Sequence, residues 1–150
     1  MAVDEDPFSL ERFLTAQSGG VYEQSLAELA AGRKRGHWIW FIFPQLRGLG
    51  SSENSRRYGI SGIDEATAYL AHPVLGARLA ACAAALLATG QADAGAALGE
   101  IDAIKLRSSM TLFERAGGGR GFGEVLERFF DGQRDPLTLA LLGAEARGRG

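Results

Sequence analysis

The chain contains 150 residues, carries a formal net charge of −2 and has one cysteine, Cys82. This length predicts a single domain, because such a chain can bury enough apolar surface for one core without disulfides or metals. One cysteine excludes an internal disulfide, and the slightly acidic balance gives no overall attraction to nucleic acids or anionic membranes. Any anion-binding role therefore depends on a local cluster of cations.

The first part of the chain predicts two helices. Asp6 followed by a proline is typical of a helix start, and apolar residues then fall on one helical face. The segment 21–31 repeats this pattern and ends at Gly32, where a left-handed C-cap is expected. The cations at 33–35 would then face the carbonyl end of that helix, where the helix dipole favours positive charge.

The remaining segments are also helical in pattern. We expect a short helix that ends near His72, an alanine-rich helix that ends at Gly90, and a helix within 101–119. Two last helices are predicted within 122–132 and 135–150.

These patterns predict an all-α fold, a compact single-domain bundle of about six to eight short helices. Residues 1–150 form one domain in this prediction, with a core over about 6–143 and a flexible C-terminal tail at 144–150. Periodicity does not assign the stretch HWIWFIFPQ, residues 37–45, so one short extended segment stays open there.

The chain also lacks several common functional signals. The N-terminus is acidic and lacks the basic head and long apolar run of a secretory signal, and no stretch approaches the roughly 18 apolar residues of a membrane-spanning helix. We therefore expect a cytoplasmic protein. Cys82 lies in an apolar run and is predicted to be a small buried side chain. Two histidines and one cysteine are too few for a dedicated zinc site, so no metal or cofactor is expected.

The segment 33–52 is the first candidate ligand-binding site, because it places cations beside an imidazole and several aromatic rings. Indole rings stack on flat ligands, cations bind phosphate, and the small residues of RGLGSS allow close approach of backbone amides. Its candidate ligand-binding residues are Lys34, Arg35, His37, Trp38, Trp40, Gln45 and Ser51. Alternatively, the rings belong to the core and the cations only complement a helix end.

The stretch KLRSS is the second candidate. If it is helical, its cations and hydroxyls lie within about one turn and could converge on an anion. Its candidate residues are Lys105, Arg107, Ser108 and Ser109. A Ser-Ser pair inside a helix can equally bond to backbone carbonyls or allow close packing of a neighbouring helix.

Several longer motifs resemble a known family. HWIWFIFPQLRGLGSS, YGISGIDEATAYLAHPVLGARL, IDAIKLRSSMTLF and VLERFFDGQRDPLTLALLG together resemble a bacterial family described as a domain of unknown function, whose members often carry the label calpastatin-like. The resemblance runs from about Asp6 to Gly143. It implies a compact, largely helical single domain, and it implies no activity, cofactor or substrate.

Three functions remain open from the sequence. The first is a binding or enzymatic pocket for a phosphate-bearing, nucleotide-like small molecule, lined by the RKRGHWIW and KLRSS segments. The second is a protein-interaction domain without catalysis and with an unknown partner. The third, nucleic-acid binding, is disfavoured by the acidic total charge. No pattern identifies catalytic residues.

Overall fold

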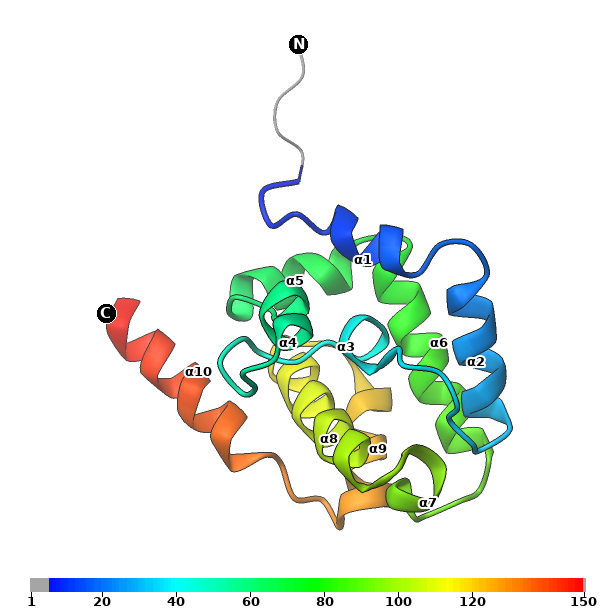
Figure 1. Ribbon diagram of the computed structural model, residues 1–150. Helices are drawn as coiled ribbons and strands as arrows, with labels where there is room; N and C mark the ends of the chain where they lie inside the picture. The colour runs from blue at the N-terminus through cyan, green and yellow to red at the C-terminus, as the bar shows by residue number, and fades with distance from the viewer. Residues whose placement is uncertain (1–5, 150) are drawn as a thin grey trace.

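Helix α8, residues Glu100–Arg115, lies at the centre of the molecule and contacts α3, α5, α7, α9 and α10 (Figure 1). The structure is a computed structural model that describes residues 6–149, with side chains up to residue 146. Most of α8 from Leu106 to Phe113 is buried, whereas its first turns carry exposed side chains. Helix α6 packs against α5 and α9, and α2 packs against α6.

Ten helices and no strand occur within residues 6–149, and the protein is 65% helical. The predicted all-α class is therefore confirmed. The helices are α1 (Glu11–Ala16), α2 (Val21–Ala30), α3 (Ile39–Ile42), α4 (Glu53–Tyr58), α5 (Ile63–Ala71), α6 (Leu75–Ala88), α7 (Ala94–Leu98), α8 (Glu100–Arg115), α9 (Arg120–Phe130) and α10 (Pro136–Arg149).

The end of α2 follows the sequence prediction. Gly32 has φ +70°, and its amide donates to the carbonyl of Leu29 at 3.0 Å. The amide of Arg33 donates to the carbonyl of Glu28, also at 3.0 Å. This pair of bonds is the Schellman motif, in which a left-handed residue satisfies the last helix carbonyls and turns the chain.

The start of α1 differs from the prediction. The carboxylate of Asp6 accepts hydrogen bonds from the amides of Leu10 at 2.6 Å and Glu11 at 3.0 Å, as a capping residue does. The helix nevertheless begins at Glu11, several residues after the expected start. Ser9, with φ +55°, interrupts helical geometry between the cap and the helix.

The stretch 37–45 is largely not extended. Residues Ile39–Ile42 form the helical turn α3, because Ile39, Ile42 and Phe43 all reach the core with helix-like spacing. Extended pairing occurs only just beyond it within the described chain, where Leu46 forms an isolated parallel bridge with Ile60.

Two short helices, α4 and α7, have no counterpart in the sequence prediction. Each begins at a capping side chain: Ser52 accepts from the amide of Ser55 at 3.1 Å, and Asp93 accepts from the amide of Ala96 at 3.1 Å. Each is shorter than two turns, so apolar periodicity cannot identify it.

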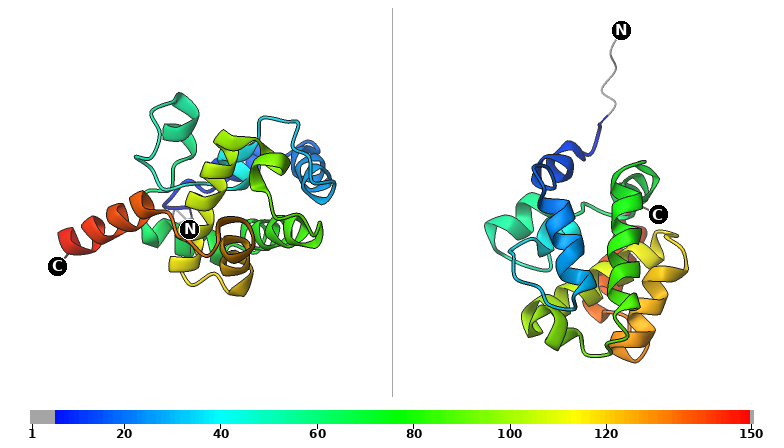
Figure 2. Two further views of the ribbon diagram at one scale, coloured as in Figure 1. Left: turned by 90° about the horizontal axis from the view of Figure 1, so that it is seen from below. Right: turned by 90° about the vertical axis from the view of Figure 1, so that its right-hand side faces the viewer.

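Helix α10 projects from the body of the molecule in Figure 1 and in the left-hand view of Figure 2. It continues to Arg149 and so includes most of the segment for which the sequence predicts a flexible tail. Glu145 of this segment accepts a 3.2 Å hydrogen bond from the amide of Ile63 at the start of α5.

No single helix in residues 6–149 is long and apolar enough to cross a membrane. The pair α5 and α6 meets the length and composition together, but the two helices are bent by 88° relative to each other.

Candidate functional site

Glu28 of α2 organises the loop that follows the basic run. Its Oε1 accepts three hydrogen bonds, from the amides of Arg35 at 2.8 Å and Gly36 at 3.0 Å and from the indole of Trp38 at 2.9 Å. Its Oε2 accepts from the side-chain amide of Gln24 at 3.0 Å. Burial alone would raise the pKa of Glu28, but these hydrogen bonds outweigh it and lower the pKa to about 2.

Asp102 of α8 joins the two candidate segments electrostatically. One carboxylate oxygen lies 2.8 Å from the ammonium of Lys34, and the other lies 3.5 Å from that of Lys105. Each ammonium also lies over an indole: Lys34 is 5.0 Å from the ring centroid of Trp38, and Lys105 is 5.5 Å from that of Trp40. Residues near 34 and 105 are therefore neighbours, as the sequence hypothesis requires.

A first concavity lies between α3, the loop before α4, and α8. Its volume is about 420 Å³. We call it the Trp40–Lys105 cavity, and its lining residues are Trp40, Gln45, Leu49, Gly50, Ser51, Ser52, Ser55, Ile101, Ile104 and Lys105. It brings together four of the predicted ligand residues, since Trp40, Gln45 and Ser51 come from the first segment and Lys105 from the second.

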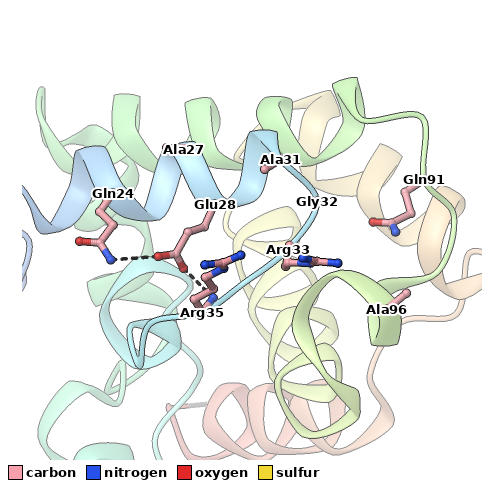
Figure 3. A pocket seen from close by; sticks show the side chains of 9 residues that line it. All are labelled: Gln24, Ala27, Glu28, Ala31, Gly32, Arg33, Arg35, Gln91 and Ala96. Carbon is pink, nitrogen blue, oxygen red and sulfur yellow. Dashed lines mark hydrogen bonds between the residues drawn. The ribbon is translucent and has the colours of Figure 1, made fainter.

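A second concavity lies between the end of α2 and the segment before α7 (Figure 3). Its volume is about 710 Å³. We call it the Arg33–Arg35 groove, and its lining residues are Gln24, Ala27, Glu28, Ala31, Gly32, Arg33, Arg35, Gln91 and Ala96. Of the predicted ligand residues it contains Arg35 alone. It shares no lining residue with the Trp40–Lys105 cavity.

Three other predicted residues of the first segment line neither concavity. Trp38 is a core residue, only 3% exposed, and the side chain of Lys34 is 8% exposed. Lys34 also donates to the carbonyl of Gly36, so its ammonium is fully engaged inside the protein. His37 is exposed on the surface.

The remaining predicted residues of KLRSS face α10 and the core. Arg107 donates to the carbonyls of Gln133 at 2.8 Å and Arg134 at 3.0 Å. Ser108 donates to the carboxylate of buried Asp135, which caps α10, at 3.3 Å, and Ser109 is fully buried. Arg107 and Ser108 hold the connection between α9 and α10, whereas the hydroxyl of Ser109 has no hydrogen-bond partner among the described residues. None of the three lines either concavity.

The sequence pattern does not identify Glu28, Asp102 or the exposed isoleucines as parts of these sites. Acidic residues on helix surfaces are common, so neither carboxylate stands out without its partners. The pattern assigns Ile101 and Ile104 to an apolar face, yet their side chains are 72% and 64% exposed at the cavity rim. Isoleucines at this spacing on a helix usually face a core, so the sequence pattern does not indicate that they line a surface cavity.

No group of three or more histidine, cysteine, aspartate or glutamate side chains within the described residues could hold a metal ion. The Trp40–Lys105 cavity offers an ammonium group, an amide and several hydroxyls beside an aromatic and aliphatic wall. The Arg33–Arg35 groove offers two guanidinium groups, two carboxamides and the carboxylate of Glu28.

Comparison with known proteins adds the family but no activity. Residues 7–142 match a family described as protein of unknown function (DUF1810). A crystal structure of the conserved hypothetical protein Rv1873 from Mycobacterium tuberculosis is similar, with 49% sequence identity and a TM-score of 0.89 over 92% of this chain and 99% of that chain. None of the curated proteins matches. The motif resemblance is confirmed for a family of unknown function, and these matches give no support to the calpastatin-like label.

Proposed function

The chain belongs to the DUF1810 family, and we propose a function from the chain's own surface because the family description names no activity. The proposal is that the Trp40–Lys105 cavity binds a phosphate-bearing, nucleotide-like small molecule. The observation that carries the proposal is the convergence of Trp40, Gln45, Ser51 and Lys105 on one concavity. The proposal retains these four predicted residues.

The charge balance near the cavity favours an anion. Asp102 lies closer to Lys34, at 2.8 Å, than to Lys105, at 3.5 Å. Two ammonium groups share one carboxylate, so one net positive charge remains. Because Lys34 is the more deeply buried of the two, this charge is available to a ligand at Lys105.

Neutral donors surround that charge. The hydroxyls of Ser51, Ser52 and Ser55 and the side-chain amide of Gln45 line the same cavity. Ser52 already donates its hydroxyl proton to the hydroxyl of Ser55 at 2.9 Å, so Ser51, Ser55 and Gln45 are the neutral groups that can donate to a ligand. Phosphate oxygens accept hydrogen bonds from hydroxyl, amide and ammonium groups alike, so this donor set suits a phosphate ester.

The opposite wall is apolar. Leu49, Ile101, Ile104 and the half-buried ring of Trp40 give an aliphatic and aromatic surface beside the polar donors. A ligand that places a flat ring on this wall and a phosphate at Lys105 uses both halves. A nucleotide has this division into an aromatic base and a phosphate.

Binding of adenosine monophosphate, measured by isothermal titration calorimetry, tests the proposal. Replacing Lys105 with methionine keeps the aliphatic stem and removes the charge, so affinity should fall about tenfold or more. Binding of adenosine, which lacks the phosphate, should be much less affected by this change. Arg120→Met is a matched control, because Arg120 is an exposed cation that lines neither concavity.

The proposal fails if adenosine monophosphate does not bind, or if Lys105→Met binds it as tightly as the unmodified protein. The proposal is also contradicted if Arg120→Met lowers the affinity for adenosine monophosphate as much as Lys105→Met does, since the loss of any cation would then have the same effect.

A protein-interaction role is the second candidate, and the exposed apolar residues favour it. Ile101 and Ile104 on α8 and Leu137 on α10 are each more than 60% exposed. Exposed apolar side chains of this size are found at protein interfaces. Ile101→Ser with Ile104→Ser would abolish capture of such a partner, whereas Lys105→Met would leave the apolar contact in place.

A further inference from the structure

The Arg33–Arg35 groove has unpaired positive charge. The guanidinium groups of Arg33 and Arg35 are exposed, and neither has a hydrogen bond or ion pair with any side chain or carbonyl of the described residues. Other arginines among the described residues donate to a carbonyl or a carboxylate, and Arg12, Arg107 and Arg134 each make more than one such bond. Figure 3 shows both free side chains in the space between α2 and the segment that carries Gln91 and Ala96.

Capping of α2 does not use these guanidinium groups. The carbonyls of Glu28 and Leu29 are satisfied by the backbone amides of Arg33 and Gly32. The helix dipole favours cations near this end, but that effect is a modest electrostatic one and needs no direct contact. Each guanidinium therefore keeps its five N–H donors for another acceptor.

Glu28 does not neutralise the pair. It is the one acidic side chain that lines the groove, and its carboxylate is already occupied by four hydrogen-bond donors from Gln24, Arg35, Gly36 and Trp38. These bonds fix the carboxylate against the loop, so it does not reach out to either guanidinium. Two cations and one sequestered anion leave the groove positive.

The neutral residues of the groove differ from those of the Trp40–Lys105 cavity. No aromatic ring lines it, and its apolar residues are the small side chains of Ala27, Ala31 and Ala96. Gln24 and Gln91 supply carboxamides. The Oε1 of Gln91 is buried and has no hydrogen-bond donor among the described residues, so a rotation of this side chain toward a ligand hydroxyl would satisfy it.

From these contacts we propose that the Arg33–Arg35 groove is a second, separate ligand site, and that its ligand is a small phosphorylated polyol. The phosphate binds Arg33 and Arg35, which present the planar fork that matches phosphate oxygens. The hydroxyls bind the carboxamides of Gln24 and Gln91. A volume of about 710 Å³ is ample for a sugar phosphate, and the absence of a ring in the lining disfavours a nucleobase.

An NMR titration of the full chain with glucose 6-phosphate tests this site. We expect backbone shifts at Gly32, Arg33 and Ala96 and a shift of the side-chain amide of Gln91. Inorganic phosphate should produce weaker shifts of the same residues, and glucose should produce almost none. Arg33→Gln with Arg35→Gln should weaken binding at least about tenfold, because each arginine contributes charged hydrogen bonds.

Two controls separate this site from general charge and from the Trp40–Lys105 cavity. Arg120→Gln removes an exposed arginine elsewhere and should leave the affinity unchanged. Lys105→Met should also leave it unchanged. Far-UV circular dichroism checks that each variant folds, and the single variants Arg33→Gln and Arg35→Gln replace the double variant if it does not.

The inference is overturned if glucose 6-phosphate causes no shifts, or if its shifts fall on Gly50, Ser51 and Lys105 instead. It is also overturned if Arg120→Gln or Lys105→Met weakens binding as much as the arginine variants do. In the case of shifts around Lys105, the function proposed for the Trp40–Lys105 cavity would gain support while the groove would lose it.

Discussion

The indole of Trp38 donates to the same oxygen of Glu28, at 2.9 Å, that accepts the amides of Arg35 and Gly36. One carboxylate on α2 thereby fixes a buried tryptophan and the backbone of the basic loop together. The basic run needs this fixed loop, because three consecutive cations repel one another and favour no single arrangement of their own. Arg33 and Arg35 end on one side of the loop, and Lys34 is directed to Asp102.

Glu28→Gln should lower the free energy of unfolding at neutral pH by about 1 to 3 kcal/mol, the usual loss for charged hydrogen bonds. The pKa of Glu28 falls from 4.5 to about 2 on folding, so the carboxylate stabilises the protein above pH 4.5. This stabilisation is lost as the pH falls through the window from 4.5 to about 2. Urea unfolding at a series of pH values measures the effect.

The variant should show a shallower loss of stability across that acidic window than the unmodified protein. Glu23→Gln is the matched control, because Glu23 is an exposed carboxylate on the same helix. If the free energy of unfolding changed with pH in the same way for Glu28→Gln and the unmodified protein, the lowered pKa assigned to Glu28 would be contradicted.

Asp135 is the second polar centre of the fold. Its Oδ2 accepts from the amide of Thr138 at 3.0 Å, from the hydroxyl of Thr138 at 2.6 Å and from Ser108 at 3.3 Å. Asp135→Ala removes a helix cap and leaves the buried hydroxyl of Thr138 without its acceptor, so the free energy of unfolding should fall by about 2 to 3 kcal/mol. Asp93→Ala, which removes a more exposed cap with a single bond, should cost about 1 kcal/mol in denaturant unfolding. Equal losses would show that the buried network adds nothing.

The sequence predicted the helices well where periodicity and caps coincide. The end of α2 at Gly32 is an example, since a glycine in the left-handed conformation at this position ends the helix. Short helices such as α3, α4 and α7 could not be predicted, because packing against α8 and local caps decide them rather than propensity.

The sequence predicted the residues of the candidate site only in part. The proximity of the two segments follows from cations that interrupt apolar patterns, and Trp40 and Lys105 do meet. The assignment of each cation was not accessible, because Lys34 and Arg107 bind groups that lie far away in the sequence, Asp102 and Arg134. Only tertiary structure decides whether a polar side chain faces a ligand or satisfies the core.

Cys82 should react slowly with thiol reagents in the folded protein and rapidly in denaturant. It is 1% exposed, and burial raises its pKa to about 12, so the reactive thiolate is absent at neutral pH. A chromogenic disulfide reagent followed by absorbance measures both rates. A variant with Cys82→Ala and Ala84→Cys places the thiol at an exposed position of the same helix and should react rapidly without denaturant. Fast labelling of native Cys82 would contradict its place in the core.

Gly76 permits a close approach between α5 and α6. A Cβ at this position would lie 2.1 Å from the backbone carbonyl oxygen of Leu70, a separation that only a backbone shift could relieve. Helix propensity alone favours alanine over glycine by about 1 kcal/mol. The clash acts in the opposite direction and involves the tight turn between two helices bent by 88°. Because this backbone cannot rotate away as a side chain can, we expect the clash to exceed the propensity gain.

Gly76→Ala should therefore lower the free energy of unfolding by about 1 to 3 kcal/mol, as overpacking does. Gly121→Ala provides the opposite case, since Gly121 lies in α9 with φ outside the left-handed region, and a methyl group added there would have no atom within 4 Å. There the propensity term acts alone, and stability should rise by about 0.5 to 1 kcal/mol. Thermal unfolding of the two variants and the unmodified protein measures whether each substitution lowers or raises the stability. The close contact between Gly76 and Leu70 would be refuted if Gly76→Ala were at least as stable as the unmodified protein while Gly121→Ala were more stable than it.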